Sequence, residues 1–484
     1  MTALPFSKAC FQLPDADHYW LCNAQVPQVL LGDDLPGSFA ANQDGLVVVD
    51  VEVADRQVLS IVPSGSIVPA GSNLSGGVHR ASVPASVPNV QVNAGLLWPC
   101  FIDMHTHLDK GHMWARSPNP DGTFSGALET VKADSTARWQ AEDVYRRAEF
   151  GLKCSYAHGT QAIRTHLDAF DDQAEISFGV FRRLRKAWAD RMQLQAVCLV
   201  TLDYFLTLKG EQLADLVAES AGVLGGVAFM NNDIVRQIDR VFELAIERNL
   251  DLDFHTDESL DPTSITLRLV AEAAIRHQFA GRITCGHCCS LSVQSDEVVQ
   301  RTIELVKSAG ISIVSLPMCN LYLQDRQSGQ PQAGGQLKAS GQLKRTPRYR
   351  GVTLLRELAA AGIDCAIASD NCRDPFFAYG DHDGLEVFTQ AVRIGHLDHP
   401  LGDWPQAITT TPAEMMGLGG SSENQSEKNR TGKIQVGSSA DFVVFKARSF
   451  NELMARGQSD RVVIRKGAQI DTTLPDYSEL DDLM

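Results

Sequence analysis

Residues 96–112, LLWPCFIDMHTHLDKGH, join a short apolar run to a pair of histidines. A run of this length, rich in bulky apolar residues, is typical of a strand buried on both faces of a sheet. Because side chains alternate along a strand, His105 and His107 point to the same side of it. The stretch therefore predicts a buried strand that presents two imidazoles at its carboxyl end.

Further runs of the same kind follow before residue 371. They are QAIRTHLD (161–168), LQAVCLV (194–200), VLGGVAF (223–229), LDLDFHTDE (250–258), RITCGHC (282–288), ISIVSLPM (311–318) and IDCAIASD (363–370). Stretches with helical periodicity lie between the runs, and several of them end in Gly or Asn. Strands alternating with helices in this way predict an α/β fold, a (β/α)8 TIM barrel over residues 96–420.

The two ends of the chain have a different pattern. Short alternating runs, LVVVDVEVADRQVLSIVP (46–63) and TGKIQVGSSADFVVFKARS (431–449), stand among Gly, Ser and Pro. We expect residues 1–95 and 421–484 to form one small β-sandwich domain built from both chain ends. Residues 324–347, rich in Gly and Gln, predict a mobile loop over the barrel mouth, and residues 419–432 a flexible linker.

Composition limits the partners. Lys and Arg total 43 against 59 Asp and Glu, so the net charge is −16, which opposes binding to nucleic acid or anionic lipid. No apolar run is long enough to cross a bilayer and no secretory signal is recognisable, so we expect a cytoplasmic protein.

The eleven cysteines form no regular framework. The cluster CGHCC at 285–289 is interpreted as small buried thiols rather than a structural zinc site, because no second cysteine pair follows at suitable spacing.

Two other predicted strands end in residues that could complete a metal site with the histidine pair. His255 ends the fifth strand and Asp370 ends the eighth. The carboxyl ends of barrel strands carry the active site, so the four side chains are expected to meet there. Three imidazoles and one carboxylate suit one divalent ion, Zn²⁺ or Fe²⁺.

The remaining histidines fall into two groups. His287, ending the sixth strand, faces the same barrel mouth and could stabilise a developing oxyanion or orient the attacking hydroxide. His166, at the end of the second strand, could contact one of the metal-binding side chains and fix its orientation without binding the metal itself. The others are predicted to be surface or packing residues: His112, His158, His277, His382 and His396.

Several motifs carry a resemblance to a known family. PCFIDMHTHLDKGH, FHTDES, CGH, SDNCRDPFFAYGD and GKIQVGSSADFVVF resemble the amidohydrolase superfamily, and more narrowly its cytosine deaminase branch. The resemblance implies that His105, His107, His255 and Asp370 bind one metal ion. It also implies that Glu258 shuttles protons and that His287 helps to activate water. Members with two ions need a bridging residue, commonly a lysine near strand four, and GGVAFMNND has no lysine.

Two positions depart from that branch and concern the substrate. Thr201 stands near the place of a glutamine that reads the pyrimidine amide, and Asn371 replaces an aspartate. Asn371 offers both a hydrogen-bond donor and an acceptor to a ring. We also expect Lys110, Phe376 and Phe377 to contact the substrate, the two aromatic rings forming a wall for a flat heterocycle.

These features predict a hydrolytic deaminase of cytosine or a related aminated heterocycle. A bound divalent metal ion lowers the pKa of water towards about 7, Asp370 and His287 hold the hydroxide, and Glu258 protonates the ring and the departing amine. One alternative is an amidohydrolase that cleaves an N-substituted aminotriazine or a cyclic amide. Another is an inactive barrel that serves as a scaffold. The expected partner is a small heterocycle, and the protein is expected to be a homo-oligomer.

Overall fold

The computed structural model describes residues 12–33, 39–69, 81–84, 86–326, 346–418, 431–457 and 460–484. Most of the predicted mobile loop (324–347) and most of the predicted linker (419–432) lie outside these ranges. The chain consists of two compact units. The first contains residues 1–102, 155–161 and 384–474, and the second contains residues 103–154, 162–383 and 475–484.

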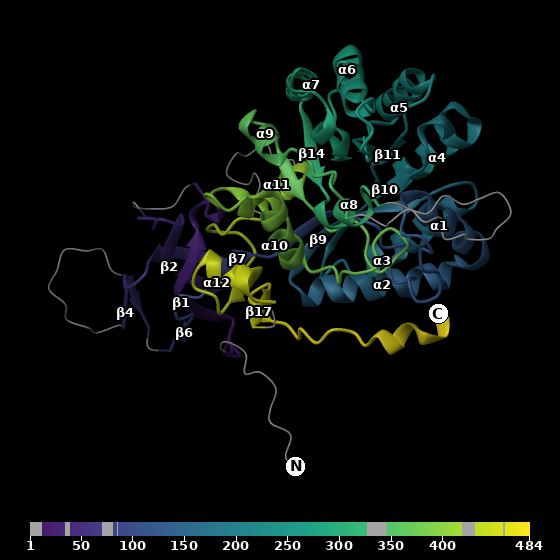
Figure 1. Cartoon of the computed structure of the whole chain (residues 1–484). Helices are drawn as coiled ribbons and strands as arrows, with labels where there is room; N and C mark the ends of the chain where they lie inside the picture. Colours follow the sequence, from purple (N-terminus) through teal and green to yellow (C-terminus); the bar gives the residue numbers. More distant parts are fainter. Residues whose placement is uncertain are drawn as a thin grey trace. The chain divides into compact units, whose positions relative to one another are not determined.

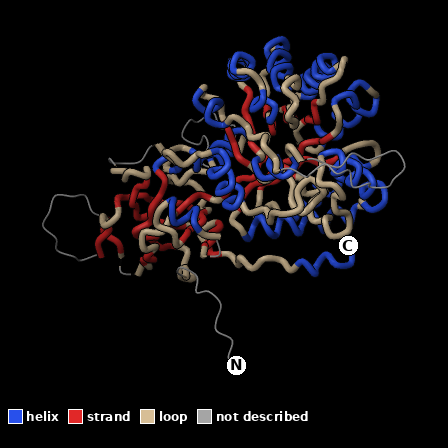
Figure 2. Tube along the Cα trace, viewed as in Figure 1, coloured by secondary structure: helices blue, strands red, loops and turns tan. Residues whose placement is uncertain are grey.

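Eight strands of the predicted barrel are present, and hydrogen bonds join neighbouring strands within each of two sheets. Strands are drawn as arrows in Figure 1 and in red in Figure 2. The strands are β8 Phe101–Thr106, β9 Thr160–Asp168, β10 Gln193–Leu199, β11 Leu224–Ala228, β12 Leu252–Thr256, β13 Ile283–His287, β14 Ile311–Ser315 and β15 Cys365–Ile367. Strands β8 to β10 form one sheet and β11 to β15 another. Parallel bridges join the two sheets at Thr201–Val227 and again at Thr106–Asp370. The ring of strands is thereby closed, and the predicted fold class is confirmed.

Helices follow the strands and lie outside them, as Figure 1 shows for α4 to α7. They are α1 Phe124–Arg138, α2 Ala141–Ala157, α3 Gln173–Ala187, α4 Leu208–Glu219, α5 Ile234–Arg248, α6 Thr266–His277, α7 Asp296–Ser308, α8 Pro317–Leu323 and α9 Leu355–Ala360. Helix α5 shows why these segments are helical, since Ile238, Val241 and Ala245 recur at helical spacing and are buried. It ends at Asn249 in the left-handed conformation (φ 52°).

The first unit contains two four-stranded sheets. One has the order β3-β2-β1-β6 and the other β18-β17-β16-β7. The strands are β1 His18–Pro27, β2 Leu46–Ala54, β3 Gln57–Pro63, β6 Asn89–Gln91, β7 Leu97–Pro99, β16 Phe442–Phe445, β17 Arg461–Arg465 and β18 Ala468–Gln469; β4 Ile67–Pro69 and β5 Ala81–Val83 form a separate pair. Strand β7 pairs with β16, with Trp98 opposite Val443. Segments from both chain ends therefore share one sheet.

The boundaries between the two units differ from the predicted domain boundaries at residues 95 and 420. Helices α10 Gly384–Gly395, α11 Thr410–Met415 and α12 Phe450–Ala455 all lie in the first unit. The Trp98 ring lies 5.5 Å from Phe388 of α10 and 6.3 Å from Phe450 of α12. Helical periodicity reveals the buried face of a helix but not which sheet covers it, so the sequence placed residues 384–420 in the barrel.

The last ten residues, 475–484, belong to the second unit rather than the first. The guanidinium of Arg116 donates to the Leu483 carbonyl oxygen over 2.9 Å, and Arg146 pairs with Asp482 at 2.6 Å. The predicted C-terminal part of the β domain therefore ends before residue 475.

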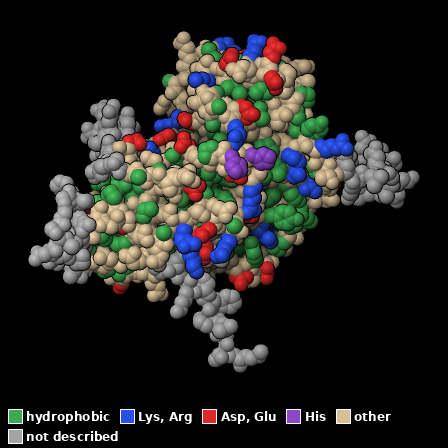
Figure 3. Space-filling view, turned by 60° about the vertical axis from the view of Figure 1, so that its left-hand side comes forward, with side chains coloured by type: hydrophobic (Ala, Val, Ile, Leu, Met, Phe, Trp, Pro, Cys, Tyr) green, Lys and Arg blue, Asp and Glu red, His purple; other side chains and the backbone are tan. Residues whose placement is uncertain are grey.

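Two surface properties bear on partners. Among the described residues, no helix combines the length and the apolar character that crossing a bilayer requires. On the face shown in Figure 3, basic and acidic side chains are interspersed. This mixture differs from the one-signed stripe that binds a phosphate backbone.

Candidate active site

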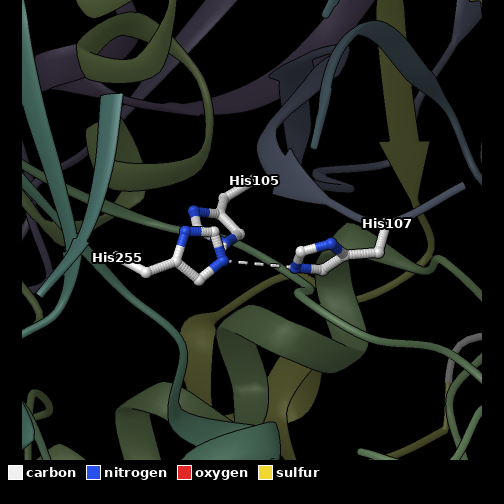
Figure 4. Close-up of side chains that lie close together, drawn as sticks. All are labelled: His105, His107 and His255. Atoms are coloured by element: carbon white, nitrogen blue, oxygen red, sulfur yellow. Dashed lines mark hydrogen bonds between the residues drawn. The ribbon is translucent and has the colours of Figure 1, made fainter. Parts of the chain in front are cut away.

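Three histidine side chains converge at the carboxyl ends of β8 and β12, with His255 facing the His105–His107 pair (Figure 4). The Nε2 atom of His255 lies 3.2 Å from Nε2 of His105 and 3.5 Å from Nε2 of His107. Gly286 on the neighbouring strand makes room for one ring, because a Cβ there would lie 3.0 Å from Cε1 of His105. A side chain at the glycine of the CGH motif would therefore crowd a histidine 181 positions earlier in the chain.

Asp370 brings a carboxylate to the three imidazoles. It follows β15, and its bridge to Thr106 of β8 is the seam between the last and first barrel strands. Its Oδ1 atom lies 3.1 Å from Nε2 of His107 and 3.8 Å from Nε2 of His105. Ligands about 2.0–2.1 Å from a tetrahedral ion stand roughly 3.3 Å from one another. The distances from His105 and His107 to the other two donors are near that value or somewhat longer. These residues could hold one divalent cation, which would take one lone pair from each.

Burial keeps the three histidines in the form that binds metal. Removal from water lowers the pKa of each imidazole well below its usual value, and charge on neighbouring imidazoles lowers it further. Lys110 adds to the effect at His107 and His255, and Arg164 at His105. Neutral rings offer a lone pair at neutral pH.

A buried polar cluster lies behind the donors. Asp253, two residues before His255, accepts from the guanidinium of Arg164 over 2.8 Å and lies 3.2 Å from Nε2 of His166. The His166 ring packs against His105 with centroids 3.9 Å apart. The structure thus places His166 where the sequence led us to expect it. The roles of Arg164 and Asp253 were not recognised from sequence, since an Arg and an Asp inside buried strands carry no motif.

Glu258 and His287 lie beside the four donors. Oε1 of Glu258 is 3.4 Å from Nδ1 of His287, and the Asn320 side-chain amide donates to the same nitrogen over 3.0 Å. The neutral His287 ring therefore carries its proton on Nε2 and can donate a hydrogen bond from that side. Burial lowers the pKa of His287 to about 3. Burial, reinforced by the charge of Asp370, raises the pKa of Glu258 well above its usual value, so Glu258 keeps a proton to give.

Several strand ends at the site are held in the left-handed backbone region. The φ angles are 50° at Asp257, 69° at His287 and 65° at Asp370. Non-glycine residues rarely adopt this conformation, and it persists only where surrounding structure enforces it. Hydrogen bonds supply that enforcement at the seam, where the Asp370 N–H donates to the His105 carbonyl oxygen over 2.8 Å.

A cavity of about 560 Å³ opens above the donors. Its polar floor consists of His107, His255, Glu258, His287 and Asp370. Aromatic side chains form much of its wall, and Phe124 of α1 lies 5.6 Å from Phe376 and 6.5 Å from Phe229, measured between ring centroids. Lys110, Thr201 and Asn371 also line it.

Two of the predicted substrate contacts are positioned differently from the expectation. Phe377 is absent from the cavity wall and packs instead against Tyr322 and Tyr379, with ring centroids 5.4 Å and 5.9 Å away. Adjacent residues in a loop point in different directions, and the sequence does not show which one faces the cavity. Asn371 reaches the cavity, but its amide nitrogen donates to Asp374 over 2.8 Å and its oxygen accepts from the Cys319 thiol over 3.4 Å. These bonds hold the loop after β15.

Lys110 enters the cavity wall as part of an ion pair. Its ammonium group lies 2.7 Å from Asp168 and 5.6 Å from the Phe376 ring centroid. Burial alone would lower the pKa of Lys110, but the charges of Asp168 and Asp109 outweigh it, so the pKa is raised. Lys110 therefore stays charged and balances two carboxylates.

We expect Lys110→Met to destabilise the fold by about 3 kcal/mol, because it leaves buried carboxylates without their cation. Urea unfolding followed by circular dichroism measures the change. Lys209→Met is the matched control, since Lys209 pairs with Asp171 at 2.6 Å but both side chains are more than half exposed. Its unfolding midpoint should not move measurably, and equal midpoints for the two variants would contradict the prediction.

Comparisons with known proteins identify the family. The model of the amidohydrolase family matches residues 211–474. Pterin deaminase of Rhizobium rhizogenes (strain K84 / ATCC BAA-868) is 47% identical over 472 residues, which cover 97% of this chain and 98% of that protein. N-isopropylammelide isopropyl amidohydrolase of Pseudomonas sp. (strain ADP) is 24% identical over 375 residues, covering 74% and 82%.

Solved structures agree in fold. The crystal structure of 5-methylcytosine deaminase from Klebsiella pneumoniae liganded with 5-fluorocytosine matches with a TM-score of 0.73 and 21% identity, covering 94% of this chain and 98% of that chain. The family resemblance found in the sequence motifs is confirmed. Because the family model covers more than half of the chain and a relative is 47% identical over nearly all of it, the chain belongs to the amidohydrolase family.

Proposed function

We propose that this protein is a metal-dependent deaminase that hydrolyses the exocyclic amino group of a pterin, a two-ring heterocycle, and releases ammonia. The cavity carries the proposal. Its polar floor holds the donors for one ion together with Glu258 and His287, and its aromatic walls extend beyond them to Phe124, Phe170 and Phe229. The relative at 47% identity is a pterin deaminase, which supports the same substrate class.

The size of the cavity favours two rings over one. A volume of about 560 Å³ lies within the range of about 300–1,000 Å³ that holds drug-sized ligands. A pterin is a 2-amino-4-oxopyrimidine fused to a second, pyrazine ring. The amino ring would occupy the polar floor and the second ring would lie among the phenylalanines. Cytosine, the single ring favoured from sequence, would leave the aromatic part of the cavity unused.

The residues at the floor have complementary tasks. A divalent ion held by His105, His107, His255 and Asp370 would supply hydroxide at neutral pH by lowering the pKa of water. Glu258 gives a proton to the ring nitrogen beside the reacting carbon, then takes the proton of the added hydroxyl group and passes it to the leaving amine. The proton that the next water loses would restore Glu258. His287 donates from Nε2 to the oxygen that adds at that carbon. Water is consumed, a carbonyl replaces the amino group, and ammonia leaves.

A substrate series tests the proposal. Isocytosine is the matched control, because it has the amino-oxo ring of pterin without the second ring. Burying that ring should contribute about 1.5–3 kcal/mol, so kcat/KM for pterin should exceed that for isocytosine by roughly 10–100-fold. Ammonia release and product chromatography give both rates. Equal or higher kcat/KM for isocytosine or cytosine would contradict a two-ring substrate.

The same assays with N-isopropylammelide as substrate test the alternative function, cleavage of an N-substituted aminotriazine or a cyclic amide. Release of isopropylamine without ammonia release from any aminated ring would favour that function instead.

The two neighbouring phenylalanines give a test of the aromatic wall. We expect Phe376→Leu to raise KM for pterin about 3–10-fold, since stacking contributes about 0.5–1.5 kcal/mol beyond area. Phe377→Leu is the control, because Phe377 packs against two tyrosines outside the wall. Both variants are compared by steady-state kinetics. A larger rise in KM for Phe377→Leu would show that the ring binds elsewhere.

A further inference from the structure

A second group of metal-binding side chains lies outside the four donors of the active site. His112, Cys372 and His382 bring two imidazole nitrogens and one thiol sulfur within 4.8 Å of one another. Their side chains are 4%, 1% and 3% exposed. The sequence led us to expect His112 and His382 at the surface or in packing, and burial of both beside a cysteine could not be read from their spacing.

The backbone holds these three residues in place. The His112 N–H donates to the Cys372 carbonyl oxygen over 3.1 Å, and the Trp114 N–H donates to the Arg373 carbonyl oxygen over 2.8 Å. His112 and His382 both have left-handed backbones, with φ angles of 61° and 54°. Non-glycine residues in this region point to a local requirement on where the side chain is directed.

The His112 ring is the clearest sign that something is bound. Among the described residues, neither of its ring nitrogens has a hydrogen-bond partner. The ring lies against Phe150 and against the His382 ring, with centroids 4.8 Å and 5.4 Å away. A buried imidazole without a partner is costly unless a ligand uses its lone pair.

Other polar groups lie near this cluster. Cys154 on α2 is close enough for the charges of Cys372 and Asp381 to act on its thiol. Gly151, one turn earlier on α2, leaves room for His382, because a Cβ there would lie 3.0 Å from its Nε2. Arg147 and Arg373 act on His112 with positive charge, which disfavours a cation. The negative charge of Asp381, which acts on Cys372, offsets that effect, and burial raises the pKa of the Cys372 thiol, so the thiol would lose its proton only as the metal binds.

The C-terminal tail lies against this group. The Tyr477 ring stacks on Phe150 at 5.5 Å, and the Arg373 guanidinium lies 4.3 Å from its centroid. The Tyr477 hydroxyl donates to Asp381 over 3.3 Å. Water is thereby kept from the cluster, as in structural zinc sites, which are closed.

We propose that His112, Cys372 and His382 bind a second divalent ion, with Zn²⁺ preferred by two imidazoles and a thiolate. The site is structural, and it joins the loop after β8 to the loop after β15 beneath the tail. Binding needs no redox step, because the thiol loses its proton to solvent as the sulfur–metal bond forms.

Cobalt substitution distinguishes this site from the active site. The four active-site donors contain no sulfur, so a Co²⁺–thiolate charge-transfer band in the near ultraviolet reports a cysteine ligand. Metal-free full-length protein is loaded with excess Co²⁺, desalted, and examined by absorption and by metal analysis. We expect two ions per chain and the thiolate band.

Variants assign the ligand. Cys372→Ser and, separately, His112→Ala should each lose one ion per chain, and Cys372→Ser should lose the band while keeping the active-site ion, which shows that the chain is folded. Cys319→Ser is the matched control, because Cys319 is buried close to Asp370 and Glu258, and it should keep both ions and the band. One ion per chain in the wild type, no band, or a band that survives Cys372→Ser would overturn the proposal.

Discussion

Replacing Glu258 by glutamine is expected to lower kcat by about 10²–10⁴-fold, the usual contribution of a positioned acid or base. Burial and the charge of Asp370 raise the pKa of Glu258 well above its usual value, which favours the protonated carboxyl group that a proton donor needs. An amide of the same size fills the same space but cannot pass a proton between the ring and the leaving amine. Because Glu258 is not among the four donors, the metal content should not change.

Ammonia release and metal analysis on the same preparation measure both quantities. Glu272→Gln is the matched control, since Glu272 forms a 2.9 Å pair with Arg268 on α6 and does not line the cavity. Turnover of Glu258→Gln within a few-fold of wild type would remove Glu258 from the chemistry. Loss of metal would mean that its role is structural instead.

Replacing His255 by alanine is expected to abolish activity to the level of metal-free protein and to remove one ion per chain. His255 is the donor that links the other two imidazoles, with Nε2 distances of 3.2 Å and 3.5 Å. Without it, two imidazoles and a carboxylate remain, and no hydroxide is generated at neutral pH if the ion is lost.

Metal analysis after dialysis measures the loss. His18→Ala is the control, because His18 is 42% exposed and pairs with Glu52 in the other compact unit. A His255→Ala variant that keeps as many ions per chain as wild type would contradict the assignment of the donors.

The convergence of His105, His107, His255 and Asp370 was predictable from sequence because each stands at the end of a recognisable strand. Alternation places His105 and His107 together, and a closed barrel brings all strand ends to one face. Arg164 and Asp253 escaped notice because their 2.8 Å contact joins residues 89 positions apart without a motif at either end.

The substrate was harder to predict for a related reason. The cavity wall depends on Phe124, the first residue of α1, and on its packing against Phe229 and Phe376. Phe124 lies outside the motifs that carried the family resemblance. Motifs at strand ends determine which reaction is possible, whereas side chains between the motifs determine which ring fits. For the same reason the sequence could not separate Phe376 from Phe377.

The bridge between the first and last barrel strands also bears on when, during synthesis, the four proposed donors can first come together. The Thr106 hydroxyl donates to the Asp370 carbonyl oxygen over 2.8 Å, across 264 positions of the chain. Asp370 reaches the three histidines only after this last strand has left the ribosome and joined the first. A nascent chain that stops before residue 370 therefore lacks the fourth donor. A site with all four donors can form only after the last barrel strand has been synthesised and has paired with the first.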